Sequence, residues 1–104
     1  MKKRPRRQSL SEIAGEIRNI AKDSARVFFT AHAENEMKND QLTATDVLQA
    51  LCGCRVTEAE PSGRYKSEGR TATGEAVAAV VQMLTLERHG KGLRVITVWR
   101  ITPR

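Results

Sequence analysis

The sequence predicts an α+β domain in which N-terminal helices pack on one face of a C-terminal antiparallel β-sheet. In the first half of the chain, apolar residues recur at the spacing of amphipathic helices. After Gly53 the pattern changes to the alternation of strands, interrupted by turn residues. Helices followed by a meander of strands form a domain of this class. The length of 104 residues suits a single domain with one core.

The first predicted helix covers residues 9–25. Ser9 and Glu12 have the spacing of a capping box, which satisfies backbone N–H groups at a helix start. The apolar face of this helix is formed by Leu10, Ile13, Ala14, Ile17, Ile20 and Ala21. Its other face is polar, so the helix is amphipathic and needs a partner surface.

Two shorter helices are predicted next, after an apolar run at residues 26–29. Thr30 is a good N-cap for a helix over residues 31–38, and Thr43 is an N-cap for the third helix. Gly53 comes just after the third predicted helix, at the position where glycine commonly ends a helix.

Four strands follow, separated by short turns that contain glycine. They are predicted at residues 55–60, 64–71, 76–86 and 93–101. The third is apolar on both faces, as expected of a central strand.

Basic residues dominate the two ends of the chain, whose net charge is +6. Residues 1–7 carry five positive charges and no negative one, so we expect residues 1–8 to form a disordered basic arm and residues 9–104 to form the domain. Residues 55–104 hold nine basic and five acidic residues, a balance of +4. This asymmetry favours a polyanionic partner such as nucleic acid, although the arm alone is also typical of a solvated terminus.

Membrane spans and secretion are not expected. The longest wholly apolar run, residues 76–81, is far shorter than the roughly 20 residues of a membrane helix. A cytoplasmic, reducing location then predicts that Cys52 and Cys54 are free thiols. Together with His32 and His89 they could in principle bind zinc, but C-x-C spacing is too short for the usual structural site. We therefore expect neither a metal nor a cofactor.

Cations on one predicted strand suggest a phosphate-binding surface. Strand alternation places Arg64, Lys66 and Arg70 on one face, which suits contacts to the phosphates of RNA. Tyr65 lies between them in the chain, and it belongs to the other face unless a bulge intervenes. We count Tyr65, with Arg64 and Arg70, among the candidate RNA contacts.

The last two strands contribute further candidates. Arg94 and Arg100 are both even-numbered and are expected to share a face, with Arg94 binding phosphate and Arg100 facing the same cleft as Lys66. Gln82 is an isolated polar residue in an apolar strand, and such a group needs a hydrogen-bond partner. It is either a core glutamine satisfied by backbone or a residue that faces a cleft.

These residue types suit RNA cleavage without a metal. RNA carries its own nucleophile, the 2′-OH, so a protein need only orient it, remove its proton and stabilise charge on phosphorus. His32, in the first turn of the second predicted helix, is a weaker acid/base candidate, and the sequence favours a structural, hydrogen-bonded histidine there.

Two runs in the first half, F-T-x-H-A-x-x-x-M at residues 29–37 and D-V-L-x-A-L at residues 46–51, resemble a group of short bacterial proteins of unknown function. That group is generally placed with the RelE-like and barnase-like ribonuclease fold. Within this fold, residues 65–67, Gln82 and residues 98–100 are similar to the MqsR-type mRNA interferase toxins.

The resemblance implies roles for three residues. Lys66 would match the catalytic lysine of the toxins, Gln82 their strand glutamine, and Arg100 a lysine that follows an aromatic residue. The acidic and aromatic residues that follow the glutamine in the toxins are replaced here at residues 83–85. The implied protein is a toxin-type endoribonuclease that an antitoxin neutralises, with a homodimer left open. The alternative is a non-enzymatic module that binds nucleic acid or a protein.

Overall fold

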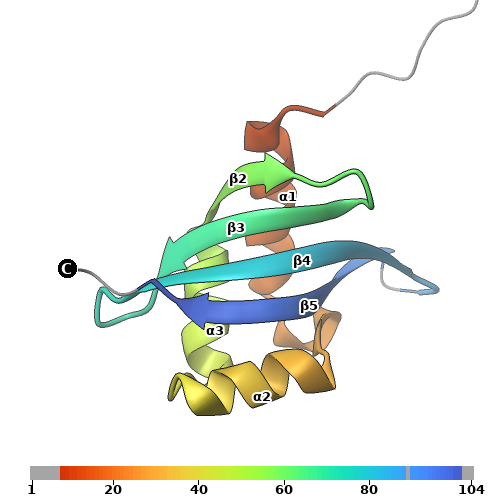
Figure 1. Ribbon diagram of the computed structural model, residues 1–104. Coiled ribbons are helices and arrows are strands. Elements are labelled where there is room, and N and C mark those ends of the chain that lie inside the picture. The colour runs from red at the N-terminus through yellow and green to blue at the C-terminus, as the bar shows by residue number, and fades with distance from the viewer. Residues whose placement is uncertain (1–7, 89, 102–104) are drawn as a thin grey trace, which may run out of the picture.

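Two of three helices cover one face of a five-stranded sheet, the third runs along the side of the sheet, and the opposite face carries no helix in the described part of the chain (Figure 1). The computed structural model describes residues 8–88 and 90–101. It confirms the predicted α+β class, in which N-terminal helices pack against the sheet. The predicted basic arm lies outside the described residues except for Gln8.

The helices begin where the sequence predicts. They are α1 (Leu10–Ala21), α2 (Ala31–Asn39) and α3 (Ala44–Cys52). Ser9 and Thr43 complete capping boxes, and Thr30 caps α2. The first helix stops earlier than predicted, because a short 3₁₀ turn, η1 (Ser24–Arg26), follows it. None of the described helices has the length and apolar character needed to cross a membrane.

The sheet is mixed and not purely antiparallel as expected. Its strands are β1 (Val27–Phe29), β2 (Arg55–Ala59), β3 (Arg64–Arg70), β4 (Ala76–Leu86) and β5 (Gly90–Arg100), in the spatial order β1-β5-β4-β3-β2. The apolar run that precedes α2 forms β1, which pairs in parallel with β5. Three residues carry too little alternation to reveal a strand, and the partner strand is remote in sequence, so the local pattern could not show this pairing.

The core lies between the helices and one face of the sheet. Ile17 of α1 and Leu51 of α3 are buried there against Val81 and Val95 of the central strands. Helix α3 approaches β3 so closely that a Cβ atom built on Gly69 would stand 1.9 Å from the carbonyl oxygen of Ala50. Only a residue without a side chain allows this contact between backbones.

Helix α2 covers the edge of β5 beyond the point where β1 ends. The carboxylate of Glu36 accepts a hydrogen bond from the backbone N–H of Val98 at 3.1 Å, and that of Asp40 accepts one from Arg100 at 2.9 Å. The hydroxyl of Thr30 donates to the carbonyl of Ile96 at 3.1 Å. Side chains from α2 and its N-cap thus satisfy backbone groups that would otherwise need another strand.

Replacing Asp40 with alanine should destabilise the domain by about 1–3 kcal/mol, because the part-buried N–H of Arg100 would lose its acceptor. Chemical unfolding of the two proteins measures this difference. Asn39→Ala is the matched control on the same helix: this side chain is exposed, and its removal should change stability by no more than about 0.5 kcal/mol. Equal stabilities of the Asp40 and Asn39 variants would contradict the proposed role of the carboxylate.

Candidate functional site

The face of the sheet that points away from the helices, here called the outer face, is built from three rows of cross-strand neighbours. The first row contains Phe28, Arg94, Gln82 and Arg64. The second row contains Thr97, Val80, Lys66 and Glu58. The third row contains Trp99, Ala78, Glu68 and Arg55. Five cations from three strands, including Arg70 next to the third row, share this face with two carboxylates.

The alternation predicted for β3 is confirmed. Arg64 and Lys66 point to the outer face, while Ser67 is buried on the helix side, where its hydroxyl donates to the carbonyl of Ala79 at 3.0 Å. Tyr65 also lies on the helix side and packs against the core. The structure therefore separates Tyr65 from the other predicted RNA contacts.

Lys66 and Trp99 contact each other across the outer face. The Lys66 Nζ atom stands 5.5 Å from the centre of the Trp99 ring, within the range of a cation–π interaction. Ala78 lies next to Trp99 on this face and is fully buried although no helix covers it. Its cross-strand neighbours on this face are Trp99 on β5 and Glu68 on β3.

Three cations of the outer face form no hydrogen bond or ion pair among residues 8–88 and 90–101, although Lys66 contacts the Trp99 ring. They are Arg64, Lys66 and Arg94, and the Nε of Arg64 is also shielded from solvent. Some cations elsewhere are engaged: Arg18 donates to the carbonyl of Cys54, and Lys91 bonds the carboxylate of Glu16. Other cations of the described residues, Lys22, Lys38 and Arg88, are exposed and form no such bond, but they are scattered, whereas Arg64, Lys66 and Arg94 share one face. The three cations are thus available to a ligand.

Gln82 lies between two of these cations, in the middle of the first row. Its register partners are Arg64 on β3 and Arg94 on β5, and its side chain is half-buried on the outer face. The core interpretation of Gln82 is therefore wrong, because its strand neighbour Val81 faces the helices and Gln82 does not.

The expected proximity of Arg100 to Lys66 is wrong. Val80 pairs with Thr97 but Val81 pairs with Val95, so Ile96 is an extra residue that forms a bulge in β5. A bulge reverses the alternation beyond it, which leaves Arg94 on the outer face and turns Arg100 to the helix side. There Arg100 bonds Glu75 and donates to the carbonyl of Asp40 at 2.7 Å.

His32 is also separate from the outer face. Its side chain is 66% exposed on α2, and its Nε2 atom is 3.4 Å from the carboxylate of Glu36. The other histidine considered for zinc, His89, lies outside the described residues. Within the part of the chain that the structure describes, no three histidine, cysteine or acidic side chains gather as metal ligands.

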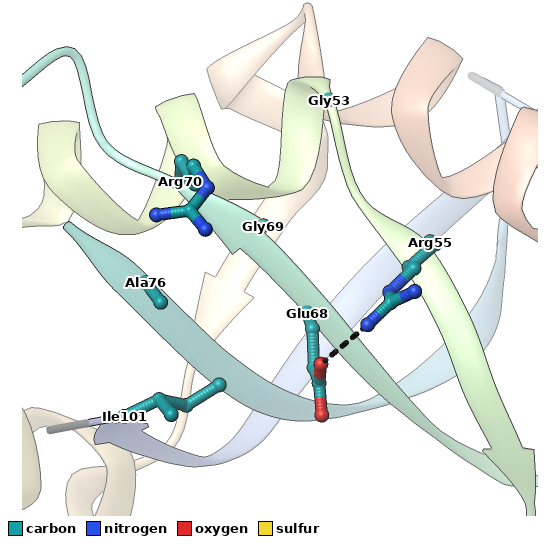
Figure 2. Close-up of a pocket in the computed structure, with 7 residues that line it drawn as sticks. All are labelled: Gly53, Arg55, Glu68, Gly69, Arg70, Ala76 and Ile101. Atoms are coloured by element: carbon teal, nitrogen blue, oxygen red, sulfur yellow. Dashed lines mark hydrogen bonds and ion pairs between the residues drawn. The ribbon is translucent and has the colours of Figure 1, made fainter. Parts of the chain in front are cut away.

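A hollow of about 540 Å³ opens at the end of the outer face beyond Trp99. It is lined by Gly53, Arg55, Glu68, Gly69, Arg70, Ala76 and Ile101. Figure 2 shows Arg55 and Arg70 on opposite sides of this hollow, with Glu68 between them. Arg55 forms an ion pair with Glu68 at 3.3 Å, and Arg70 donates to the carbonyl of Gly74 at 2.8 Å. The predicted phosphate contact Arg70 therefore lies in the hollow, apart from Arg64.

The two cysteines lie in different environments. Both are free thiols; Cys54 is buried and Cys52 is partly buried. Burial raises the pKa of Cys54 to about 11, so its thiol remains protonated at neutral pH and is a poor nucleophile.

Iodoacetamide at neutral pH should therefore leave Cys54 unmodified in the folded protein. Mass spectrometry of the native protein should show at most one alkyl group, located on Cys52, and a second group only after unfolding. Rapid alkylation of both cysteines in the native state would show that Cys54 is not protected by burial.

Sequence reasoning missed several residues of the outer face: Arg55, Glu58 and Trp99 were not predicted as site residues, and neither was Phe28. Phe28 is 45% exposed and stands beside Arg94 at the end of the first row. The apolar run at residues 26–29 contained the signal, since alternate residues of a strand point to opposite faces. Phe28 could be recognised only by assigning residues 26–29 to a strand of the sheet.

Residues 29–100 match one protein family, described as a domain of unknown function (DUF4258). This match covers α2, α3 and all strands except most of β1. No curated protein matches the chain.

Proposed function

We propose that this chain, which belongs to the DUF4258 family of domains of unknown function, binds single-stranded RNA across its outer face. The proposal is carried by one observation: Arg64, Lys66 and Arg94 form no hydrogen bond or ion pair in the described part of the chain, and they share the face opposite the helices with Phe28 and Trp99. Clustered cations with neighbouring aromatic side chains suit the phosphates and bases of a nucleic-acid strand.

The aromatic residues favour an unpaired strand over a duplex. In a double helix the bases stack on one another, and their faces are hidden from a protein. Unpaired bases can stack on aromatic side chains while their phosphates pair with lysine or arginine. Phe28 lies on β1 beside the first row and Trp99 lies on β5 in the third row, so an RNA strand that runs along β5 can contact both.

Trp99 is the only tryptophan of the chain, so its fluorescence reports stacking directly. Titration with a short unpaired oligoribonucleotide should quench this fluorescence. Each phosphate contact on a single strand contributes roughly −0.7 to the slope of log affinity against log salt, so three cations predict a slope of about −2.

The Lys66→Ala variant tests whether the outer face is the binding surface. It should reduce the salt slope by roughly 0.7, as expected for one phosphate contact. The control is Lys22→Ala, which removes an equal charge from an exposed position at the end of α1. Unchanged fluorescence, or equal effects of the two substitutions, would rule out the outer face as the binding surface.

A toxin-type endoribonuclease is the second candidate, and one pairing favours it. Glu58 is the cross-strand neighbour of Lys66, which places a carboxylate and an ammonium group on the face that also carries Arg64 and Gln82. The Glu58 carboxylate would take the proton of the 2′-OH as that oxygen forms a bond to phosphorus. The bond from phosphorus to the 5′-oxygen breaks, and the Lys66 ammonium protonates the leaving oxygen. In this scheme Arg100 and His32 have no part.

Incubation with end-labelled RNA in EDTA distinguishes the two candidates. An endoribonuclease of this type should leave 2′,3′-cyclic phosphate ends, and Glu58→Gln and Lys66→Ala should each abolish cleavage while Glu60→Gln does not. RNA that is bound but remains intact would leave the binding module as the function. An antitoxin would be required only for the active enzyme, and the outer face is the surface that it would cover.

A further inference from the structure

We infer that the hollow between Arg55 and Arg70 binds a phosphate monoester at the end of an RNA strand, an inference that rests on the proposed RNA binding. The hollow continues the outer face beyond the third row. The backbone N–H of Ile101 donates to the carbonyl of Ala76 at 2.9 Å, and Ala76 pairs with Arg70, so these three residues extend the sheet next to Trp99.

The spacing of the strands connects this hollow to the stacking surface. Two residues along a strand span about 7 Å, so Ile101 lies about that far from Trp99 on the same face of the sheet. A nucleotide whose base stacks on Trp99 therefore has its phosphate within reach of the hollow. Gly53 lines the hollow with backbone alone, and a Cβ atom added there would meet no atom within 4 Å, so the hollow is open on that side.

The charge of the hollow favours a terminal phosphate over an internal one. Arg55 is already paired with Glu68, whereas Arg70 bonds only a backbone carbonyl through one of its five N–H donors. A phosphate monoester carries a charge of about −1.5 to −2 at neutral pH, compared with −1 for an internal diester. The two guanidinium groups shown in Figure 2 outnumber the Glu68 carboxylate between them, and a monoester competes with Glu68 for Arg55 more strongly than a diester does, because it carries more charge.

Oligoribonucleotides that differ only at their ends test the inference. A strand with a terminal phosphate, placed at either the 5′ or the 3′ end, should bind about tenfold more tightly than the same strand with hydroxyl ends. Comparison of the two phosphorylated strands identifies the end that enters the hollow. Arg70→Gln and Arg55→Gln should remove this preference, whereas Arg88→Gln, at an exposed position in the β4–β5 turn, should preserve it.

Adenosine 5′-monophosphate and adenosine test the hollow independently of strand binding. The monophosphate should shift the NMR signals of the Arg70 guanidinium, and adenosine should not. If all strands bind equally whatever their ends, the inference is overturned while the proposed function stands. If no strand binds but the monophosphate binds through Arg70, the hollow is a phosphate site and the proposed function is overturned. If neither binds, both are overturned.

Discussion

Removal of the Trp99 ring should weaken RNA binding more than any other substitution on the outer face. Stacking of one base on an aromatic side chain contributes about 1–3 kcal/mol, so affinity should fall roughly 5- to 150-fold. The loss includes the cation–π contact with Lys66, whose Nζ lies over the ring. Binding is measured by the fluorescence anisotropy of a labelled oligonucleotide, since the variant has no tryptophan.

The choice of replacement separates binding from folding. Trp99 is the cross-strand neighbour of the fully buried Ala78, so we expect Trp99→Ala to expose apolar surface as well. Trp99→Leu keeps an apolar cover without a ring and should bind as weakly as the alanine variant, whereas Trp99→Phe should retain part of the affinity. Phe28→Ala, at a residue that is 45% exposed, should weaken binding without loss of stability. Wild-type affinity of the leucine variant would exclude stacking at this position.

Gly69→Ala should destabilise the domain by at least about 3 kcal/mol, at the upper end of the range for overpacked sites. The new Cβ atom would stand 1.9 Å from the carbonyl oxygen and 2.7 Å from the carbonyl carbon of Ala50. Both of these are backbone atoms, so no side chain can move aside, and α3 must separate from β3. For a domain of ordinary stability, about 5–15 kcal/mol, this is a large fraction of the total.

Gly53→Ala is the control for this substitution, because Gly53 lines the same hollow. An added Cβ atom at Gly53 meets no atom within 4 Å, and its φ of −124° is accessible to alanine. The free energy of unfolding of the Gly53→Ala variant should stay within about 0.5 kcal/mol of wild type. Midpoints of urea unfolding compare the two variants. Equal midpoints would show that α3 can shift without cost.

Most elements could be predicted from sequence, because their signals are local. Capping residues such as Ser9 and Thr43 mark helix starts within a few positions, and the apolar character of β4 identifies a central strand. The pairing of β1 with β5 is not local, since Val27 meets Leu93. A pattern within three residues could not reveal that partner.

The candidate site was predictable only as far as strand alternation holds. Arg64 and Lys66 share a face because β3 pairs with β4 in an unbroken register. Arg100 was misplaced because the bulge at Ile96 depends on how β5 pairs with β4 and is invisible in β5 alone. Similarity to the interferase toxins remains a prediction, because the family that the chain matches has no known function and so indicates no activity for it.

The contacts of α2 with the far end of the chain also determine when the protein can fold. Val98 and Arg100, which donate to Glu36 and Asp40, follow them by 62 and 60 residues. During synthesis, β1 and α2 therefore leave the ribosome well before the strand that holds them in place. Contacts this remote cost loop-closure entropy before they stabilise anything, which slows folding. We expect the nascent chain to fold only after β5 has emerged, with the apolar face of α1 exposed to chaperones until then.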